Sequence, residues 1–238
     1  MSTLSLLYKK QFAINDSIHI IVPTVGQIIE DEDSYYGLVS LLTAMPIDLM
    51  AQLDDLKIDF TSINDYELFL LLFPILKSKD TSLIFGDLDI SDLEVAVNEQ
   101  NGKLALVNKN GEIIIDRAIH GKIAATLRKI HHLEKNNRKP ANNEAKKFML
   151  ERARAKMRHS KNRKEDSQLE ALIIAMVNTE QYKYDFESTK ELSIFQFNES
   201  VRQIIKKIDY DNRMYGVYSG TINAKELSQE DLNWLTHK

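Results

Sequence analysis

Two groups of residues carry side chains that could hold a metal ion. His131 and His132 are adjacent, and Asp87, Asp89 and Asp92 alternate with apolar residues. Neighbouring residues of a helix point about 100° apart, and no carboxylate follows the histidines at a suitable spacing, so one ion could not use both. We interpret the histidines as a surface pair. The aspartates lack the bidentate acid and central glycine of a calcium loop, so we expect them to cap helices and turns.

Chemistry of other kinds has little support in the sequence. The chain has no cysteine and only eight glycines, and it contains no phosphate-binding glycine loop, nucleophile elbow or dinucleotide fingerprint. No nucleophile, base and orienting group can be proposed together. We therefore expect a protein that is not an enzyme and that needs no cofactor and no metal.

The most unusual stretch of the chain runs from Lys135 to Lys164. It has twelve Lys/Arg against two acids, a net charge of +10, whereas the residues before it sum to −9 and those after it to −5. Pro140 ends whatever precedes it, and Asn142 or Asn143 begins a helix whose bases fall all around its circumference. Such a helix is not expected inside a core.

Three interpretations of this basic helix remain open. It could be a solvated connector, a nucleic-acid contact, or a rod that docks on an acidic protein surface, including one of this chain's own. Nucleic acid is less favoured because Phe148 is the only aromatic residue in the stretch. The candidate basic contact residues are Lys147, Arg152, Arg154, Lys156 and Arg158.

Composition and charge together predict an α+β protein with two domains. At 238 residues, with 43% hydrophobic and 28% charged residues, the chain can bury two small cores. We predict an N-terminal α+β domain over residues 1–134, a basic helical linker over 135–164 and an all-helical C-terminal domain over 165–238.

We expect a soluble protein. The longest apolar run, Leu68–Leu76, is far shorter than the ~20 residues that span a membrane. In Met1–Lys10 the bases follow the apolar patch, which is the opposite order to a secretory signal.

The first domain shows helix and strand signals in alternation. Ser17–Val22 predicts a strand, and Pro23-Thr24 opens a helix. Further helices are expected over Tyr35–Ala44 and Ile47–Leu53, and Asn64 or Asp65 can cap a helix that is apolar on nearly every side up to Leu76 and therefore buried.

Two Asn-Gly pairs, at 101–102 and 110–111, predict a three-stranded antiparallel meander. Its strands would be Leu93–Glu99, Lys103–Asn108 and Glu112–Asp116, with Leu93, Val95 and Val97 on one face. A helix over 117–133, capped by Asp116 and striped with Ile119, Ile123, Leu127 and Ile130, should cover that sheet.

The second domain contains two amphipathic helices that could pack face to face. They span 169–177 and 194–208, Ser188 or Thr189 can cap the second, and the helix should continue to a left-handed cap near Gly220. An apolar helical face can also receive a partner helix. The candidate partner-binding residues are Leu169, Leu172, Ile173, Met176, Ile194, Phe197, Val201 and Ile205.

Three parts of the chain together resemble a family encoded among the tail genes of phages and prophages of Gram-positive bacteria. They are Val22–Ile29 with Tyr35–Leu38, then Asp65–Phe69, and finally Leu192–Phe197 with Tyr215–Gly220 and Asn233–Leu235. The resemblance implies a tail assembly chaperone, a helix-rich and acidic protein of the host cytoplasm. Such proteins coat the long helical tape-measure protein until the tail tube polymerises around it.

Two other functions stay open. One is a structural component of the tail or baseplate that remains in the virion, with tail-tube or baseplate proteins as partners. The other is a nucleic-acid-binding regulator that uses the basic helix. The sequence does not exclude a homo-oligomer in any of these cases, and it predicts no membrane partner.

Overall fold

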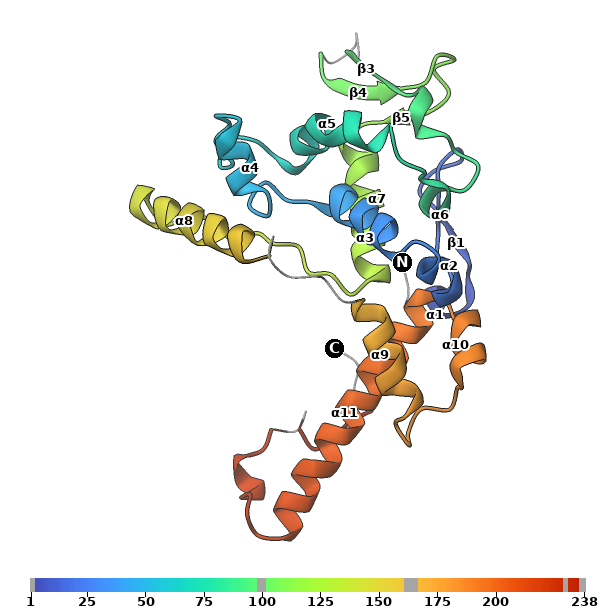
Figure 1. Cartoon of the computed structure of the whole chain (residues 1–238), viewed down its shortest axis with the longest axis vertical. Helices are drawn as coiled ribbons and strands as arrows, with labels where there is room; N and C mark the ends of the chain where they lie inside the picture. The colour runs from blue at the N-terminus through green and yellow to red at the C-terminus, as the bar shows by residue number, and fades with distance from the viewer. Residues whose placement is uncertain (1–2, 98–101, 161–166, 229–230, 236–238) are drawn as a thin grey trace.

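The computed structural model describes residues 3–97, 102–160, 167–228 and 231–235. Figure 1 shows helices around two small sheets at one end, α8 extending to one side and α11 running away from the body at the other end. The predicted α+β fold class, with an antiparallel meander and a helical C-terminal region, is confirmed.

Helices and strands alternate in the first part of the chain. The elements are α1 (Thr3–Tyr8), β1 (Gln11–Ala13), β2 (His19–Ile21), α2 (Val25–Ile29), α3 (Glu32–Thr43), α4 (Met50–Asp55), α5 (Asp65–Leu76), α6 (Ser82–Phe85), the 3-10 turn η1 (Ile90–Asp92), β3 (Glu94–Val97), β4 (Leu104–Val107), β5 (Ile114–Ile115) and α7 (Arg117–Ile130). The remaining elements are α8 (Asn143–Ser160), α9 (Gln168–Val177), α10 (Phe186–Glu191), α11 (Ile194–Tyr218) and the 3-10 turn η2 (Ala224–Glu226).

Local caps set most of the helix starts in the first part. Thr24 begins α2 with a capping box, Asp31 accepts a hydrogen bond from the Ser34 amide at the start of α3, and Asn64 begins α5 with a second capping box. The starts of α2 and α5 agree with the predictions, whereas α3 begins at Glu32 and not at Tyr35, and α4 begins at Met50 and not at Ile47. The strand predicted over Ser17–Val22 is present as β2, and it pairs with β1, which the sequence did not predict.

Two burial predictions are wrong. Helix α5 is not covered on all sides, since Leu71 and Ile75 are 43% and 49% exposed. The meander has the predicted order β3-β4-β5, but Val95 and Val97 are 51% and 59% exposed. The reason is that α7 packs beside β5 and covers the end of the sheet near Leu106, so β3 extends beyond it.

The C-terminal helices lie where they were predicted, but the predicted cap of the second helix is wrong. Ser193, with a capping box, begins α11, whereas Asp185 caps the short helix α10, so the predicted cap at Ser188 or Thr189 is wrong. Helix α11 then runs without a break to Tyr218, and Gly220 adopts the expected positive φ of 77°.

One main hydrophobic core joins the two ends of the chain. It contains Ile20 and Leu38 from the first part together with Ile173 and Phe197 from the last. A smaller second core holds Ile47, Leu53, Phe60 and Leu68. The C-terminal helices therefore share their core with the N-terminal residues, and the boundaries predicted near residues 134 and 164 stay a prediction.

Candidate functional site

Most of the predicted partner-binding residues lie inside the main core. Leu169, Ile173, Met176, Ile194, Phe197 and Val201 are all 8% exposed or less, and Leu172 is half-buried against them. Their apolar face is therefore covered by the chain itself, because the first elements of the fold pack onto α9 and α11. Ile205, which is 49% exposed, is the one candidate that remains accessible.

Hydrogen bonds fix the start of α11 to the N-terminal part. The Ile194 amide donates to the Pro23 carbonyl at 2.9 Å, and the Val25 amide donates to the Leu192 carbonyl at 2.8 Å. The Gln196 side chain donates to the Leu7 carbonyl at 2.8 Å. This end of α11 is therefore part of the body of the protein.

The two adjacent histidines lie at the same junction. The His131 Nε2 lies 2.9 Å from the Tyr35 hydroxyl, whereas the His132 ring stacks on Phe195 and its Nε2 lies 3.5 Å from Glu199. His132 also has a positive φ of 53° because it follows the C-terminus of α7, where the Leu133 amide bonds back to the Arg128 carbonyl. The expectation of a surface pair is confirmed for His132, which is exposed, and wrong for His131, which is half-buried, and both rings help to join α7 to the other helices.

Burial makes the two histidines poor bases. Desolvation lowers the pKa of His131 to about 4, and the neighbouring His132 adds to this shift. The pKa of His132 is also lowered, chiefly by desolvation, although Glu199 opposes the shift. Both rings are therefore neutral at pH 7, as their packing against aromatic rings requires.

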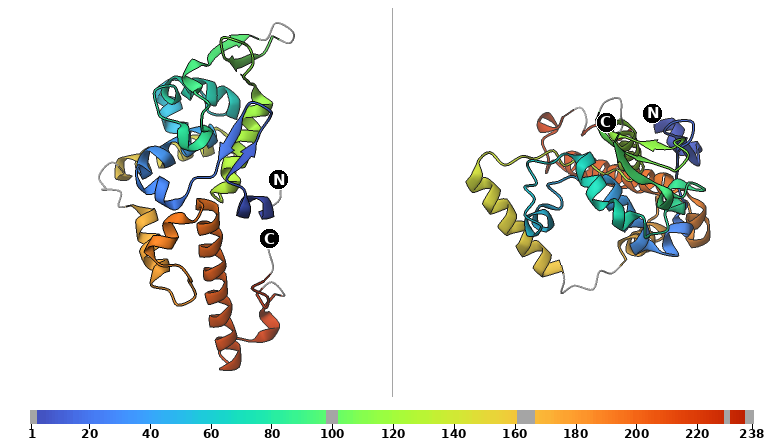
Figure 2. Two further views of the ribbon diagram at one scale, coloured as in Figure 1. Left: turned by 90° about the vertical axis from the view of Figure 1, so that its right-hand side faces the viewer. Right: turned by 90° about the horizontal axis from the view of Figure 1, so that it is seen from above.

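Beyond Val201, helix α11 leaves the core. Ile205, Tyr215 and Tyr218 are 49%, 77% and 86% exposed. The left view of Figure 2 shows this half of α11 extending from the body, accompanied by the chain that follows it. A helix of 25 residues is about 37 Å long, so its outer turns lie far from the main core.

The C-terminal segment, described over residues 219–228 and 231–235, covers one side of this outer half. Arg213 forms an ion pair with Asp231 at 2.5 Å, and the Gln203 side chain donates to the Trp234 carbonyl at 3.0 Å. The Lys207 ammonium lies 5.5 Å from the centre of the Trp234 ring. Trp234 is thus attached to α11.

The opposite side of the outer half carries an apolar seam. We define the α11 seam as Val201, Ile205, Ile208, Asn212 and Tyr215, which are spaced alternately four and three residues apart. This spacing places them in one row along a helix and is the pattern by which two helices pair. This spacing is present in the sequence, but the positions nearer Ile194 are more apolar and give the stronger amphipathic pattern.

The basic helix α8 is not a free connector. Lys146 pairs with Asp59 at 2.5 Å, and Arg154 reaches both Asp54 and Asp55 at 2.7 Å. Met149 and Leu150 pack against the second core. Of the three interpretations, docking on an acidic surface of the chain's own describes this side of α8.

The other candidate bases lie outside these ion pairs, and Arg158 lines a small pocket with Asp55 and Arg154 on the side of α8 that faces α4. Lys147, Arg152, Lys156 and Arg158 are exposed, as is Phe148 at 64%. None of these four bases forms an ion pair with the part of the chain that the structure describes. Of the five predicted contact residues, Arg154 is therefore occupied by acids of the chain itself, while the other four bases remain available to a partner.

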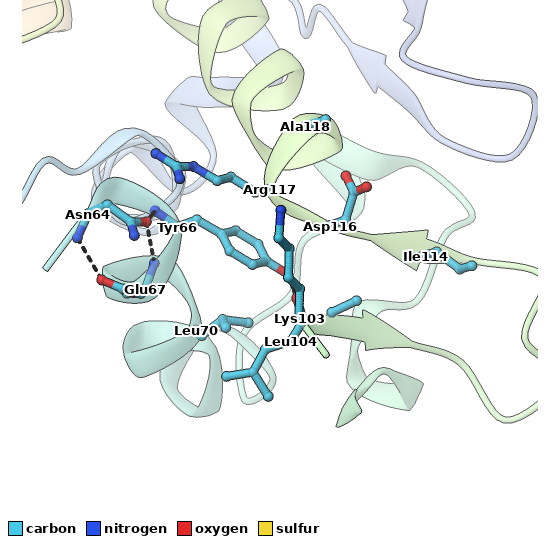
Figure 3. Close-up of a pocket in the computed structure, with 11 residues that line it drawn as sticks. Asn64, Tyr66, Glu67, Leu70, Lys103, Leu104, Ile114, Asp116, Arg117 and Ala118 are labelled. Carbon is cyan, nitrogen blue, oxygen red and sulfur yellow. Dashed lines mark hydrogen bonds between the residues drawn. The ribbon is translucent and has the colours of Figure 1, made fainter. Parts of the chain in front are cut away.

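A cavity of about 800 Å³ lies between the start of α5, the meander and the start of α7 (Figure 3). Tyr66 points into it, and its hydroxyl donates to the Ile115 carbonyl at 2.7 Å. Burial raises the pKa of Tyr66 to about 12, so the phenol stays protonated and holds β5 to α5. The charged groups on the rim include Glu67, Asp116 and Arg117.

The other sequence candidates have structural roles. Asp89 accepts a hydrogen bond from the Ser91 amide and caps η1, as predicted. Within the described ranges, no three His, Asp or Glu side chains lie close enough together to hold a metal ion. No helix among the described residues is both long and apolar enough to cross a bilayer.

Comparison with known proteins gives one match. Neither the curated proteins nor the solved structures contain a match to this chain. Residues 161–238, however, match the family model described as YomV second domain. The C-terminal part, which contains α9, α10, α11 and the α11 seam, is therefore similar to a phage-type domain.

Proposed function

We propose that this protein is a phage tail assembly chaperone that binds the tape-measure protein in the host cytoplasm and catalyses no reaction. Two observations support the phage assignment: the match of residues 161–238 to YomV second domain and the resemblance of several segments to tail-gene products. The tape measure as partner comes from the resemblance alone.

The observation that carries a binding function is the exposed outer half of α11. A soluble domain normally covers a row of large apolar side chains, and here the C-terminal segment covers the opposite side of the helix instead. The free row suits an amphipathic helix, which is the shape of a tape-measure segment. The binding face is thus the outer half of α11, because the inner half is already covered.

Co-expression with the tape-measure protein from the same phage genome tests this function. We expect the two proteins to co-purify and the soluble yield of the tape measure to rise. Ile205→Ser should weaken co-purification, whereas Ile174→Ser should not, because Ile174 is equally exposed at 48% but lies on α9, away from the seam. If wild-type protein neither retains nor solubilises the tape measure, the function is refuted.

Two rival functions have separate tests. A structural component of the tail or baseplate would be present in mature particles, whereas a chaperone would be absent from them. A nucleic-acid-binding regulator is favoured by the four remaining candidate bases of α8, which are exposed. Reversing Lys147, Arg152, Lys156 and Arg158 to glutamate should then abolish retention of nucleic acid, and wild-type binding should weaken steeply with salt.

A further inference from the structure

We infer that the α11 seam binds one helix of a different protein, with an apolar row spaced four and three residues apart and with Lys or Arg on both sides of that row. This inference rests on the proposed function as a protein-binding protein, and it specifies the chemistry of the partner. A second copy of this chain would be the competing occupant.

The seam offers a row that can interlock with another helix. Val201 is buried at the edge of the main core, Ile208 is half-buried, and Ile205 and Tyr215 are open to solvent. The C-terminal segment lies mainly against Gln203, Lys207 and Arg213 on the opposite side of α11, and it reaches the seam only at its outer end, where Ile222 lies beside Gly216. A partner can therefore approach the row from Val201 to Asn212 without displacing it. The seam is about two heptads long, so it can hold a short helical segment.

Asn212 gives the seam a fixed register. It lies between Ile208 and Tyr215 and is exposed. A polar residue within such a row must find a polar partner on the opposite helix when water is excluded, and this favours one alignment over the others. The partner helix should therefore carry one polar residue within its own apolar row.

The positions beside the seam are acidic in its outer part. Asp209 lies on one side, and Asp211 lies on the other. Lys207 lies 2.5 Å from Asp211 on the same helix, which offsets part of that charge, and Arg202, nearer the core, is paired with Glu199 at 2.7 Å. A partner with Lys or Arg beside its row would pair with these two carboxylates.

Two copies of the chain satisfy these charges poorly. In a parallel pair Asp209 would face Ile204 and Asp211 would face Gly216, so neither carboxylate would meet a cation. In an antiparallel pair Asp209 can face Arg202, but that base is already paired with Glu199 at 2.7 Å. Charge complementarity thus favours a basic helix from another protein.

Two designed peptides of 21 residues test this inference with the full-length protein. Both have Ile and Leu at the row positions and one Asn within the row, and they differ only in carrying Lys or Glu at every flanking position. We expect the Lys peptide to bind at least about tenfold more tightly than the Glu peptide at low salt, with the difference shrinking as salt is added. Equal binding of the two peptides, or no binding of either, would overturn the inference.

Charge-neutralising variants locate the contact. Asp209→Asn with Asp211→Asn should weaken Lys-peptide binding by about three- to fivefold, as expected from two exposed charge pairs. Glu226→Gln, an exposed acid in η2, is the matched control and should change nothing. Sedimentation of the wild-type protein tests whether a second copy of the chain occupies the seam instead. If the protein forms dimers and Ile205→Ser abolishes them, the seam binds a second copy and the inference is wrong.

The two proposals can fail separately. If the tape measure co-purifies but the Asp209 and Asp211 variants and the Lys peptide have no effect, the proposed function stands and the partner chemistry inferred for the seam falls. If the Lys peptide binds at the seam but the tape measure does not co-purify, the binding surface stands and the chaperone function falls.

Discussion

Helices α8 and α11 differ in how the chain uses their side chains. The sequence presents α8 as a solvated basic rod and α11 as an accessible amphipathic helix. In the structure, two bases and two apolar residues of α8 hold it against the second core, whereas the apolar face at the start of α11 is enclosed by the main core. The accessible parts are the outer side of α8 and the outer half of α11.

This comparison shows what a hydrophobic or charged pattern leaves undecided. An apolar stripe has the same appearance in a sequence whether its own chain or a partner covers it. The same holds for a basic face, which can meet an acid in its own chain. Segments near the N-terminus, which contact the start of α11 through Leu7 and Pro23, decide the matter for the inner half of that helix.

The largest expected effect contrasts the two halves of α11. Phe197→Ala should lower the free energy of unfolding by about 3 to 5 kcal/mol, because the ring is fully buried and a cavity would remain. Tyr215→Ala should change it by less than about 0.5 kcal/mol, since that ring is 77% exposed. Urea denaturation measures both, and similar losses would mean that the outer half is also packed.

Acid should destabilise the protein through two histidines, His120 within α7 and His131 at the end of that helix. His120 and His131 have pKa values of about 4, lowered chiefly by burial, whereas an unfolded histidine titrates near 6.5. The unfolded chain therefore binds more protons between these values, so stability falls as pH drops from about 6.5 to about 4. The slope is about 1.4 kcal/mol per pH unit for each residue.

Denaturation at several pH values measures this dependence. His131→Gln removes one of the two titrating rings, so it should reduce the pH slope of the free energy of unfolding by about half. Stability that does not change between pH 6.5 and pH 4 would contradict the burial of both rings.

A smaller effect should appear on α8. Leu150→Ala removes a half-buried contact with the second core and should lower the free energy of local opening of α8 by about 1 to 2 kcal/mol. Hydrogen exchange of the α8 amides measures this opening. Phe148→Ala on the outer side is the control, and an equal change in both variants would show that α8 is not docked through its inner side.

The smallest effect is expected at Gly216. A Cβ atom there would lie 2.5 Å from the Ile222 side chain, so Gly216→Ala should displace the C-terminal segment. The gain in helix propensity, about 1 kcal/mol, offsets much of this cost in overall stability. Limited proteolysis should therefore show faster cleavage within residues 219–235 at nearly unchanged stability, and unchanged cleavage would argue against this packing.

The sequence by itself determined the local features of this protein. The turn at Asn110-Gly111, the caps at Thr24, Asn64 and Asp116 and the 3.6-residue periodicity of α7 depend on neighbouring residues, and each is present where it was predicted. The predicted turn at residues 101–102 lies partly outside the described residues. The basic helix and its start near Asn143 follow from the same short-range rules.

Only the tertiary structure decided which faces are free. His131 meets Tyr35 across 96 positions of sequence, and Arg154 meets Asp55 across 99, and no local periodicity encodes such distant partners. Burial depends on how whole elements pack, and a few elements close the space around the inner half of α11 while leaving its outer half uncovered. The spacing of the α11 seam is visible in the sequence, whereas its exposure depends on how the rest of the chain packs.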